Sequence, residues 1–361
     1  MTLHPTLLER GALLHLAVAG AGLELLQRLW RQPGSSAYLA GASLLQARHQ
    51  MERFIGFEPD HGYCSQETAL DMAMAAFLQA CKDLAKEDTP DKRPLGIALT
   101  AAVASNRIPR GDQRAHLAIV SPQGVLSHTL PLEKSEGVDA RLSHDRQIAD
   151  FALEKLESAI QVETYPENRC AFERLRAHPV FKPDGSRQAT RMEKAAYFPA
   201  NFNPMHDGHR LAYCEAEKRI GRPVQLMIEA HPPNKPAIPL PELLRRVALL
   251  QLESERFARP VEITFGEPNY LDKVRARPGS QFVAGADAVQ RLLQPCWGYE
   301  VTEMLREMDA CGTRFYVLGR HQEGELKTVD HLPIPEAYQH LFIQMDGHVH
   351  ISSSELRDQI R

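Results

Sequence analysis

The sequence lacks most of the features that would assign its 361 residues to a specialised class of protein. The six cysteines are scattered without a C-x-x-C pair, a pattern typical of reduced thiols and not of a disulfide framework. No apolar run reaches the ~18 residues of a membrane span. Basic residues are not in excess, since 42 Lys and Arg face 46 Asp and Glu, whereas nucleic-acid affinity comes mainly from neutralised phosphates. We therefore expect a cytoplasmic protein that binds neither membrane nor nucleic acid.

The composition that remains is that of an ordinary globular protein, with 43% hydrophobic and 24% charged residues. At roughly 100 to 200 residues per domain, the length predicts about two domains. The apolar run from 11 to 29 includes His15, Glu24 and Arg28. We interpret it as part of a first helix and not as a targeting signal, because the charges interrupt it.

The first part of the chain, residues 1–165, mixes helices and strands and predicts an α/β domain. Residues 166–190 are polar and interrupted by prolines and a glycine, which favours a linker. In the first part, periodicity and apolar runs predict helices at 5–32, 66–85 and 143–160 and strands at 95–100, 116–121 and 124–132.

The second part, residues 191–361, alternates regularly between strand and helix. This alternation predicts a parallel, Rossmann-like sheet whose ligands lie at the carboxyl ends of the strands. The expected strands are 195–198, 224–229, 261–265, 281–284 and 314–318; the expected helices are 208–220, 241–255, a short one from 270, 287–293 and a terminal one from about 352.

One chemistry-bearing segment, 198–209, lies between an expected strand and helix. It places His206 and His209 on either side of Gly208 at the start of the helix. Imidazoles and free backbone N–H groups at a helix N-terminus together favour a bound polyanion.

A second segment, 351–357, contains three consecutive serines. Ser352 followed by Glu355 fits a capping box, so a helix is expected to begin here. Its N–H groups, the hydroxyls of Ser353 and Ser354, and Arg357 form a second anion site. Two anion sites in one alternating domain suggest a nucleoside triphosphate.

These motifs resemble those of the HxGH nucleotidylyltransferase superfamily, which includes nicotinamide and nicotinate mononucleotide adenylyltransferases. The segment Gly285-Ala286-Asp287 is similar to the G-A-D segment of that family, and 233–236 is similar to a loop in a less studied branch of it. The matching residues are Phe202, Asn203, Pro204, His206, Gly208 and His209 in the first motif and Ile351, Ser352, Ser353, Leu356 and Arg357 in the second, with Ser354 replacing a threonine.

The resemblance implies attack of a phosphorylated acceptor on the α-phosphorus of ATP or another NTP, with release of pyrophosphate. It assigns His206 and His209 to the α- and β-phosphate oxygens and Asp287 to the nucleotide or acceptor. Mg²⁺ is expected on the triphosphate, held mainly by phosphate oxygens and water, with no metal site in the protein. Further implied contacts are Phe202, Asn203, Gly208 and Gly285 to the nucleotide, Lys235 to the acceptor, and Ser352, Ser353, Ser354 and Arg357 to the pyrophosphate.

One position departs from the family pattern, because Ala200 stands where a glycine is common. If the backbone there needs a positive φ, the alanine costs roughly 1 to 2 kcal/mol. If φ is negative, the alanine adds only a methyl group near the α-phosphate.

Residues 1–165 resemble the CinA C-terminal, or nicotinamide-nucleotide amidohydrolase, family at 33–36, 39–41 and 55–57. Alignment on Pro33-Gly34-Ser35-Ser36 nevertheless leaves non-matching residues at the positions that the resemblance marks as functional. We interpret this domain as catalytically inactive, with a role in dimerisation or ligand sensing. The non-matching residues are Val18, Ala19, Ala21, Gln46 and Met51.

Simpler interpretations exist for each motif. The histidines fit ordinary polar loop positions, or a zinc site with His348 and His350, although no cysteine or helical i, i+4 pair supports zinc. The serines and Asp287 fit helix caps, and Lys235 fits a solvated loop charge. At the level of function, the alternatives are another phosphorylated acceptor, such as a phosphopantetheine or a polyol with ATP or CTP, and a non-catalytic nucleotide sensor.

Overall fold

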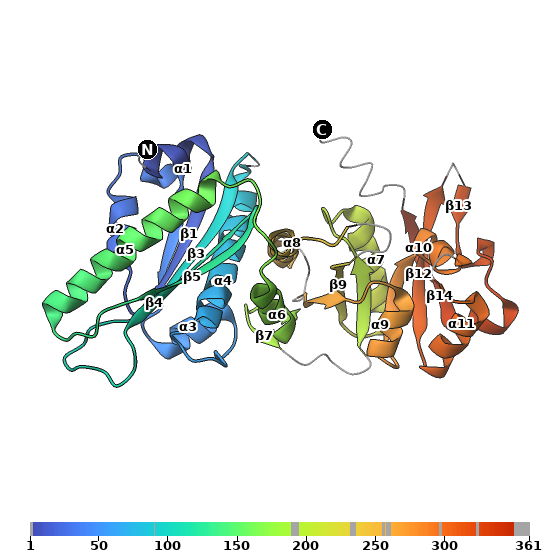
Figure 1. Ribbon diagram of the computed structural model, residues 1–361. Coiled ribbons are helices and arrows are strands. Elements are labelled where there is room, and N and C mark those ends of the chain that lie inside the picture. The colour runs from blue at the N-terminus through green and yellow to red at the C-terminus, as the bar shows by residue number, and fades with distance from the viewer. Residues whose placement is uncertain are drawn as a thin grey trace. The chain divides into compact units, whose positions relative to one another are not determined.

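The protein has an α/β fold, seen in a computed structural model that describes residues 3–89, 91–188, 195–231, 236–254, 257, 261–295, 298–322 and 325–349 (Figure 1). The chain forms two compact units. The first unit comprises Met1–Pro179, Asp184–Ala189 and Pro239–Leu252, and the second comprises Val180–Pro183, Thr190–Ile238 and Glu253–Arg361.

The first unit is built on a sheet of five strands: β1 (Ala12–Ala19), β2 (Leu39–Leu44), β3 (Arg93–Ala102), β4 (Arg114–Ser121) and β5 (Gly124–Pro131). Their order is β2-β1-β3-β4-β5. β1 is parallel to both β2 and β3, whereas β4 is antiparallel to β3 and β5. The sheet therefore has one parallel part, centred on β1, and one antiparallel part.

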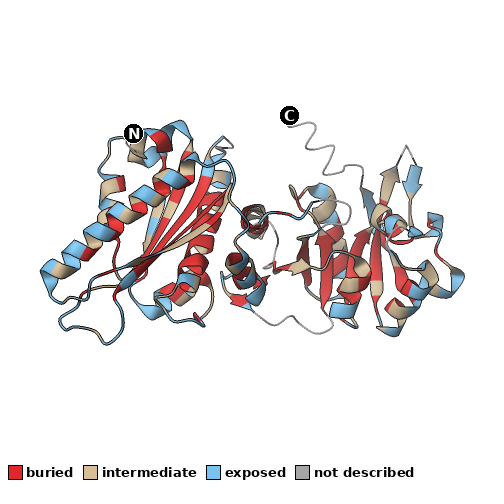
Figure 2. Ribbon diagram, in the orientation of Figure 1, coloured by how far each residue is buried: buried red, intermediate tan, exposed pale blue. Residues whose placement is uncertain are grey.

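Helices cover both faces of this sheet, and its central strands are buried (Figure 2). On one face, α4 (Gln66–Glu87) lies so close to β3 that a Cβ at Gly96 would lie 2.2 Å from the Ala73 carbonyl oxygen. On the other, α2 (Leu23–Trp30) and α5 (Val138–Gln161) share an apolar cluster with β1, β3 and β4. Further helices of this unit include α1 (Leu3–Glu9), η1 (Ser35–Ala37) and α3 (Arg48–Ile55).

The prediction of a single helix over 5–32 was wrong, because the centre of this segment is the strand β1. Seven of its eight residues are buried, and a strand buried on both faces has a continuous apolar sequence with no period of two. Gly11 and Gly20 bound the strand at φ 61° and 81°, values that glycine adopts at little cost and that interrupt a helix. The other predicted helices and strands of this unit are confirmed.

The expected linker over 166–190 also contains ordered structure. α6 (Arg169–Ala177) begins after Asn168, whose side chain accepts a hydrogen bond from the N–H of Ala171 at 3.0 Å. Two short strands follow, β6 (Val180–Phe181) and β7 (Arg187–Gln188). The sequence did not indicate α6, because the helix has only nine residues and the segment around it is rich in proline and polar residues.

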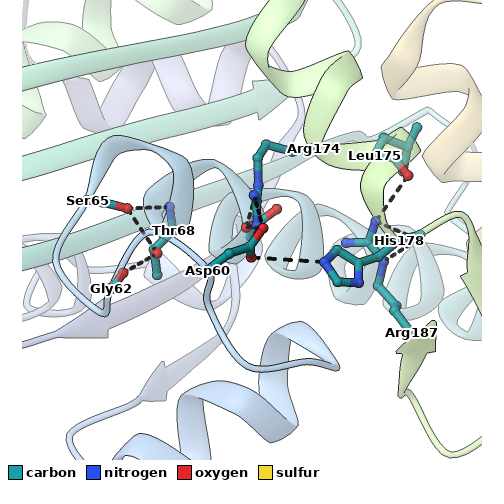
Figure 3. A network of polar contacts seen from close by, with 9 residues as sticks. Asp60, Gly62, Ser65, Thr68, Arg174, Leu175, His178 and Arg187 are labelled. Carbon is teal, nitrogen blue, oxygen red and sulfur yellow. Dashed lines mark hydrogen bonds and ion pairs between the residues drawn. The ribbon is translucent and has the colours of Figure 1, made fainter. Parts of the chain in front are cut away.

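A cluster of charged side chains, which we call the arginine clamp, joins α6 to other parts of the first unit (Figure 3). It consists of Asp60, Asp71, Arg174 and Arg187. Arg174 donates to both oxygens of Asp60 at 2.9 and 3.0 Å and to one oxygen of Asp71 at 3.0 and 2.7 Å. Arg187 donates to the carbonyl oxygen of His178 at 3.0 Å. The attraction between Arg174 and the two carboxylates offsets part of the free-energy cost of removing these charges from water.

The second unit contains six parallel strands: β8 (Ala196–Ala200), β9 (Val224–Glu229), β10 (Ile263–Gly266), β11 (Gln281–Gly285), β12 (Arg314–Gln322) and β14 (Phe342–Val349). They lie in the order β10-β9-β8-β11-β12-β14. This is the doubly wound Rossmann order, in which the direction of winding reverses between β8 and β11. β6 and β13 (Glu325–Lys327) add antiparallel pairs to β10 and β12.

An apolar cluster joins this sheet to the helices α9 (Tyr270–Ala276), α10 (Ala286–Leu292) and α11 (Val301–Ala310). α7 (Asp207–Ile220) packs against the sheet at β9, β11 and β14. The predicted strands between 195 and 318 are confirmed, whereas the sequence did not indicate α11, β13 or most of β14. Two short 3-10 helices, η3 (Val329–His331) and η4 (Glu336–Leu341), precede β14.

One helix departs from the expected division of the chain. α8 (Leu240–Glu253) follows β9 in the sequence, yet all of it except its last residue belongs to the first unit. Its Glu242 and Arg245 act electrostatically on Cys81 of α4. In the part of the chain that the structure describes, no helix is both long and apolar enough to cross a bilayer.

Candidate active site at the switch point of the second unit

The first motif lies where predicted, in the loop from β8 to α7. Phe202 adopts φ 46° in this loop and is buried, a left-handed conformation that is unusual for an aromatic residue. Asn203–Pro204 is a cis peptide. Ala200 belongs to β8 and does not have a positive φ. Of the two alternatives for Ala200, the structure therefore supports the one in which the side chain adds only a methyl group.

The imidazoles of His206 and His209 stack on each other in the first turn of α7. Their ring centroids are 3.7 Å apart at an interplanar angle of 24°. Phe198 and Phe202 meet the ring of His209 with centroids 5.8 and 5.1 Å away. The backbone N–H of His206 donates to Nδ1 of His209 at 3.4 Å, which leaves the proton of the neutral ring on Nε2. That nitrogen is then a hydrogen-bond donor.

Both imidazoles are held neutral at physiological pH. The pKa of His209 is lowered to about 3, chiefly by burial and in addition by the charges of His206, Arg320 and Arg210. Burial also lowers the pKa of His206, again with Arg320 and Arg210. Nδ1 of His206 is buried and has no hydrogen-bond partner among the described residues. Buried polar atoms are normally paired, so this nitrogen is a candidate for contact with a ligand.

The G-A-D segment lies at the carboxyl end of β11, where α10 begins. Asp287 pairs with Arg320 of β12 at 2.8 Å and with Arg291 at 3.3 Å. The Gly285 backbone is close to Asp287, because a Cβ there would lie 2.7 Å from Oδ1 of that residue. Asp287 is therefore an ion-pair partner at the sheet edge.

Strand pairing places the histidine motif and the G-A-D segment on neighbouring strands. β8 and β11 are neighbours, with Ala196 opposite Gln281 and Tyr197 opposite Phe282. Their carboxyl ends are the two ends that flank the reversal of strand order, where α/β proteins bind ligands. The charge of Arg320 also acts on both imidazoles. The site so formed, His206, His209, Asp287 and Arg320, is called the switch-point site below.

Arg320 is the member of this site that sequence reasoning missed. Its position beside Asp287 follows from the register of β12, in which Leu318 lies opposite Gly285. Arg210 is also near, but it already pairs with Glu253 at 2.8 Å and with Asp207 at 2.7 Å. The sequence did contain a signal for Arg320, because this arginine lies two residues after the expected strand 314–318, where ligands of parallel sheets bind.

Several predicted site residues lie outside the described residues: Lys235, Ser352, Ser353, Ser354 and Arg357. The convergence of the serine segment with the histidines therefore stays a prediction. Two further histidines belong to the alternative of a zinc site. His350 also lies outside the described residues, and the ring centroid of His348 is 4.9 Å from that of His321. Among the described residues, no group of three or more His, Cys, Asp or Glu is arranged to hold a metal ion.

The corresponding edge of the first unit is filled by its own side chains. Asp145 of α5 accepts hydrogen bonds from the N–H groups of Gly22 and Glu24 at the start of α2, at 2.5 and 2.9 Å. Arg141 donates to the carbonyl oxygens of Gly20 and Ala104 at 2.8 and 3.2 Å. These contacts occupy the helix N-terminus that follows β1.

Comparisons with known proteins give structural likenesses only. No family model and no curated protein matches the chain. A CinA superfamily protein from Enterobacter cloacae is 15% identical, with a TM-score of 0.35 over 44% of this chain and 89% of that chain. The competence/damage inducible protein CihA from Agrobacterium tumefaciens is 20% identical, with a TM-score of 0.31 over 43% and 96%.

A further structure is the Plasmodium falciparum nicotinic acid mononucleotide adenylyltransferase complexed with NaAD. It is 14% identical, with a TM-score of 0.30 over 46% of this chain and 83% of that chain. The TM-scores of these three structures are all below 0.5.

Proposed function

We propose that this protein is a nucleotidylyltransferase, which transfers AMP from ATP to a phosphorylated acceptor and releases pyrophosphate. The observation that carries the proposal is the pair of neutral, stacked imidazoles at the first turn of α7. They follow β8, which is paired with β11, the strand that leads to Asp287, at the reversal of strand order. This position suits a phosphate chain, because helix N-termini bind anions. The acceptor proposed is nicotinamide or nicotinate mononucleotide, on the resemblance of both parts of the sequence to families that handle this nucleotide.

The chemistry requires little beyond positioning and charge stabilisation. A phosphate oxygen of the acceptor attacks the α-phosphorus, and the bond from that phosphorus to the bridging oxygen of pyrophosphate breaks. Nε2–H of His209 donates to a phosphate oxygen, and the unpartnered nitrogen of His206 becomes available to the ligand. A bound polyanion stabilises the protonated imidazoles and so raises their pKa values.

The remaining roles are proposals for residues outside the described part. Ser352, Ser353, Ser354 and Arg357 hold the departing pyrophosphate, and Lys235 contacts the acceptor. Mg²⁺ enters with the triphosphate and is carried by its oxygens and water. The first unit is proposed to be non-catalytic, with a role in self-association.

The test is release of pyrophosphate by the full chain with ATP or CTP, Mg²⁺ and a panel of acceptors. The panel contains nicotinamide mononucleotide, nicotinate mononucleotide, phosphopantetheine and a phosphorylated polyol. Turnover with one acceptor that is abolished in His209→Ala supports the enzyme. His340→Ala is the matched control, since this exposed histidine pairs with Asp309 elsewhere in the same unit, and it should leave turnover unchanged.

A nucleotide sensor is the second candidate. The observation that favours it is the first unit, whose helix N-terminus after β1 is filled by Asp145 and whose sequence has lost the residues of the family it resembles. Tight binding of ATP without pyrophosphate release from any acceptor would support the sensor and contradict the enzyme.

A further inference from the structure

Arg320 is the cation best placed to move between the protein and a ligand at the switch-point site. It lies on β12, two residues beyond Leu318, which faces the last residue of β11. Its guanidinium Nη1 is 2.8 Å from Oδ2 of Asp287. The same charge acts on His206 and His209. One guanidinium on a third strand therefore pairs with Asp287 and acts electrostatically on both histidines.

We propose that Arg320 is a phosphate-binding residue, and that Asp287 holds it in place until the triphosphate arrives. This inference rests on the proposed function, because it assigns the bound group as the triphosphate of that reaction. When the anion binds at the imidazoles, the guanidinium exchanges the carboxylate of Asp287 for phosphate oxygens. Arginine suits this exchange because its planar donors match carboxylate and phosphate alike.

The neighbouring arginines are less suited to the role. Arg291 also pairs with Asp287, but its side chain is 64% exposed, against 27% for Arg320. A more exposed pair contributes less, since water screens it. Arg210 holds two carboxylates, of Glu253 and Asp207. Among the described residues, Arg320 has one carboxylate partner, Asp287, which it shares with Arg291. Its release therefore breaks one ion pair and leaves Asp287 still paired.

The arrangement also explains why a cation stands beside two imidazoles whose protonation it opposes. In the absence of ligand, the positive charge lowers the pKa values of His206 and His209. A phosphate chain bound between them would be attracted by the guanidinium and by the imidazole donors together. In the free protein the imidazoles stay neutral near this guanidinium. When an anion enters, it favours their protonated forms, and the cation and the imidazoles attract it together.

The experiment compares four forms of the full chain: wild type, Arg320→Gln, Arg320→Lys and Arg291→Gln. Binding of ATP, inorganic pyrophosphate and adenosine is measured calorimetrically in the presence of Mg²⁺. We expect Arg320→Gln to weaken ATP and pyrophosphate binding by about tenfold to a hundredfold, the effect of one charge-assisted hydrogen bond. Arg320→Lys should recover part of the loss, and Arg291→Gln should remain within about threefold of wild type.

Adenosine separates phosphate binding from a structural role, because it lacks phosphate and its affinity should not depend on Arg320. Equal weakening of adenosine and ATP in Arg320→Gln would overturn the inference, as would unchanged ATP binding in that variant. ATP binding that depends on Arg320, without pyrophosphate release from any acceptor, would retain the inference and reject the enzyme. Absence of ATP and pyrophosphate binding in wild type would reject both.

Discussion

The two units of this protein use the same kind of sheet edge in opposite ways. In the first, the helix that follows β1 begins against the carboxylate of Asp145, which accepts from Gly22 and Glu24. In the second, the helix that follows β8 begins with two stacked imidazoles. A carboxylate at a helix N-terminus stabilises the helix and occupies the place of an anion. The first edge is therefore closed by the chain itself.

The buried polar groups of the two units also differ in where they lie. The arginine clamp of the first unit joins Arg174 to both Asp60 and Asp71. In the second unit, Nδ1 of His206 is buried without a partner among the described residues. Buried atoms without a partner among the described residues also occur in the first unit, for example Oδ1 of Asp71 and Nδ1 of His15. The contrast is therefore one of position, because the nitrogen of His206 lies where a helix begins after a strand, at the carboxyl edge of the sheet. The following changes test this contrast.

The largest effect is expected in the arginine clamp. Arg174→Ala should lower the free energy of unfolding by about 3 to 5 kcal/mol, because it leaves the buried carboxylate of Asp71 without its ion-pair partner. Urea titration measures the change. Arg169→Ala is the control on the same helix, since that side chain is 93% exposed, and it should change stability by less than about 0.5 kcal/mol. Equal losses in the two variants would contradict a stabilising clamp.

At the switch-point site, we expect a small effect on stability and a large effect on activity. His206→Phe retains a ring beside His209 and removes the unpartnered buried nitrogen. The free energy of unfolding should stay within about 1 kcal/mol of wild type or rise, while kcat/KM for pyrophosphate release should fall by about a hundredfold or more. Steady-state kinetics and urea titration measure the two effects. Full activity in this variant would remove His206 from the mechanism.

A smaller effect is expected at the closed edge of the first unit. Asp145→Ala should lower the free energy of unfolding by about 1 to 2 kcal/mol, the loss of a helix cap. Inorganic phosphate should then stabilise the variant more than wild type, because the helix N-terminus is open. Asp150→Ala is the control on α5, since that carboxylate is 69% exposed. No difference between the two variants would show that Asp145 does not close the edge.

The smallest effect concerns the pH dependence of stability. The pKa of His209 is about 3 in the folded protein and near 6.5 when unfolded, so below pH 6.5 the unfolded chain binds a proton that the folded one does not. Stability therefore falls as pH falls, by about 1 kcal/mol from this residue between pH 6.5 and 5.5. His209→Gln should lose that part of the pH dependence. An identical pH profile in the variant would contradict a buried neutral imidazole.

The sequence predicted most of the strands of the second unit and the place of the two histidines between β8 and α7, while their role in a site stays a prediction. The strand over 224–229 was predicted to the residue, because buried parallel strands are short apolar runs with clear breaks at both ends. The histidines were found because a strand, a loop and a helix start follow one another within 198–209. Local patterns are sufficient when the elements and the site residues are close in the sequence.

The features that sequence missed depend on distant partners. Arg174 and Asp71 are 103 residues apart, so nothing local marked α6 as a docked helix. Asp145 meets the start of α2 across 123 residues. Arg320 reaches Asp287 only through the register of β12 and β11. β1 was mistaken for a helix because burial on both faces removes the alternation that identifies a strand.

The course of the chain through α8 limits how the protein can be divided. After β9 the chain leaves the second unit, supplies Pro239–Leu252 to the first and then returns to form β10. A gene fragment that stops before residue 190 would encode a first half without this helix. A fragment that starts there would carry the helix with its apolar side uncovered. The two halves are thus interleaved along the chain, and duplication or exchange of either one alone would leave an incomplete core.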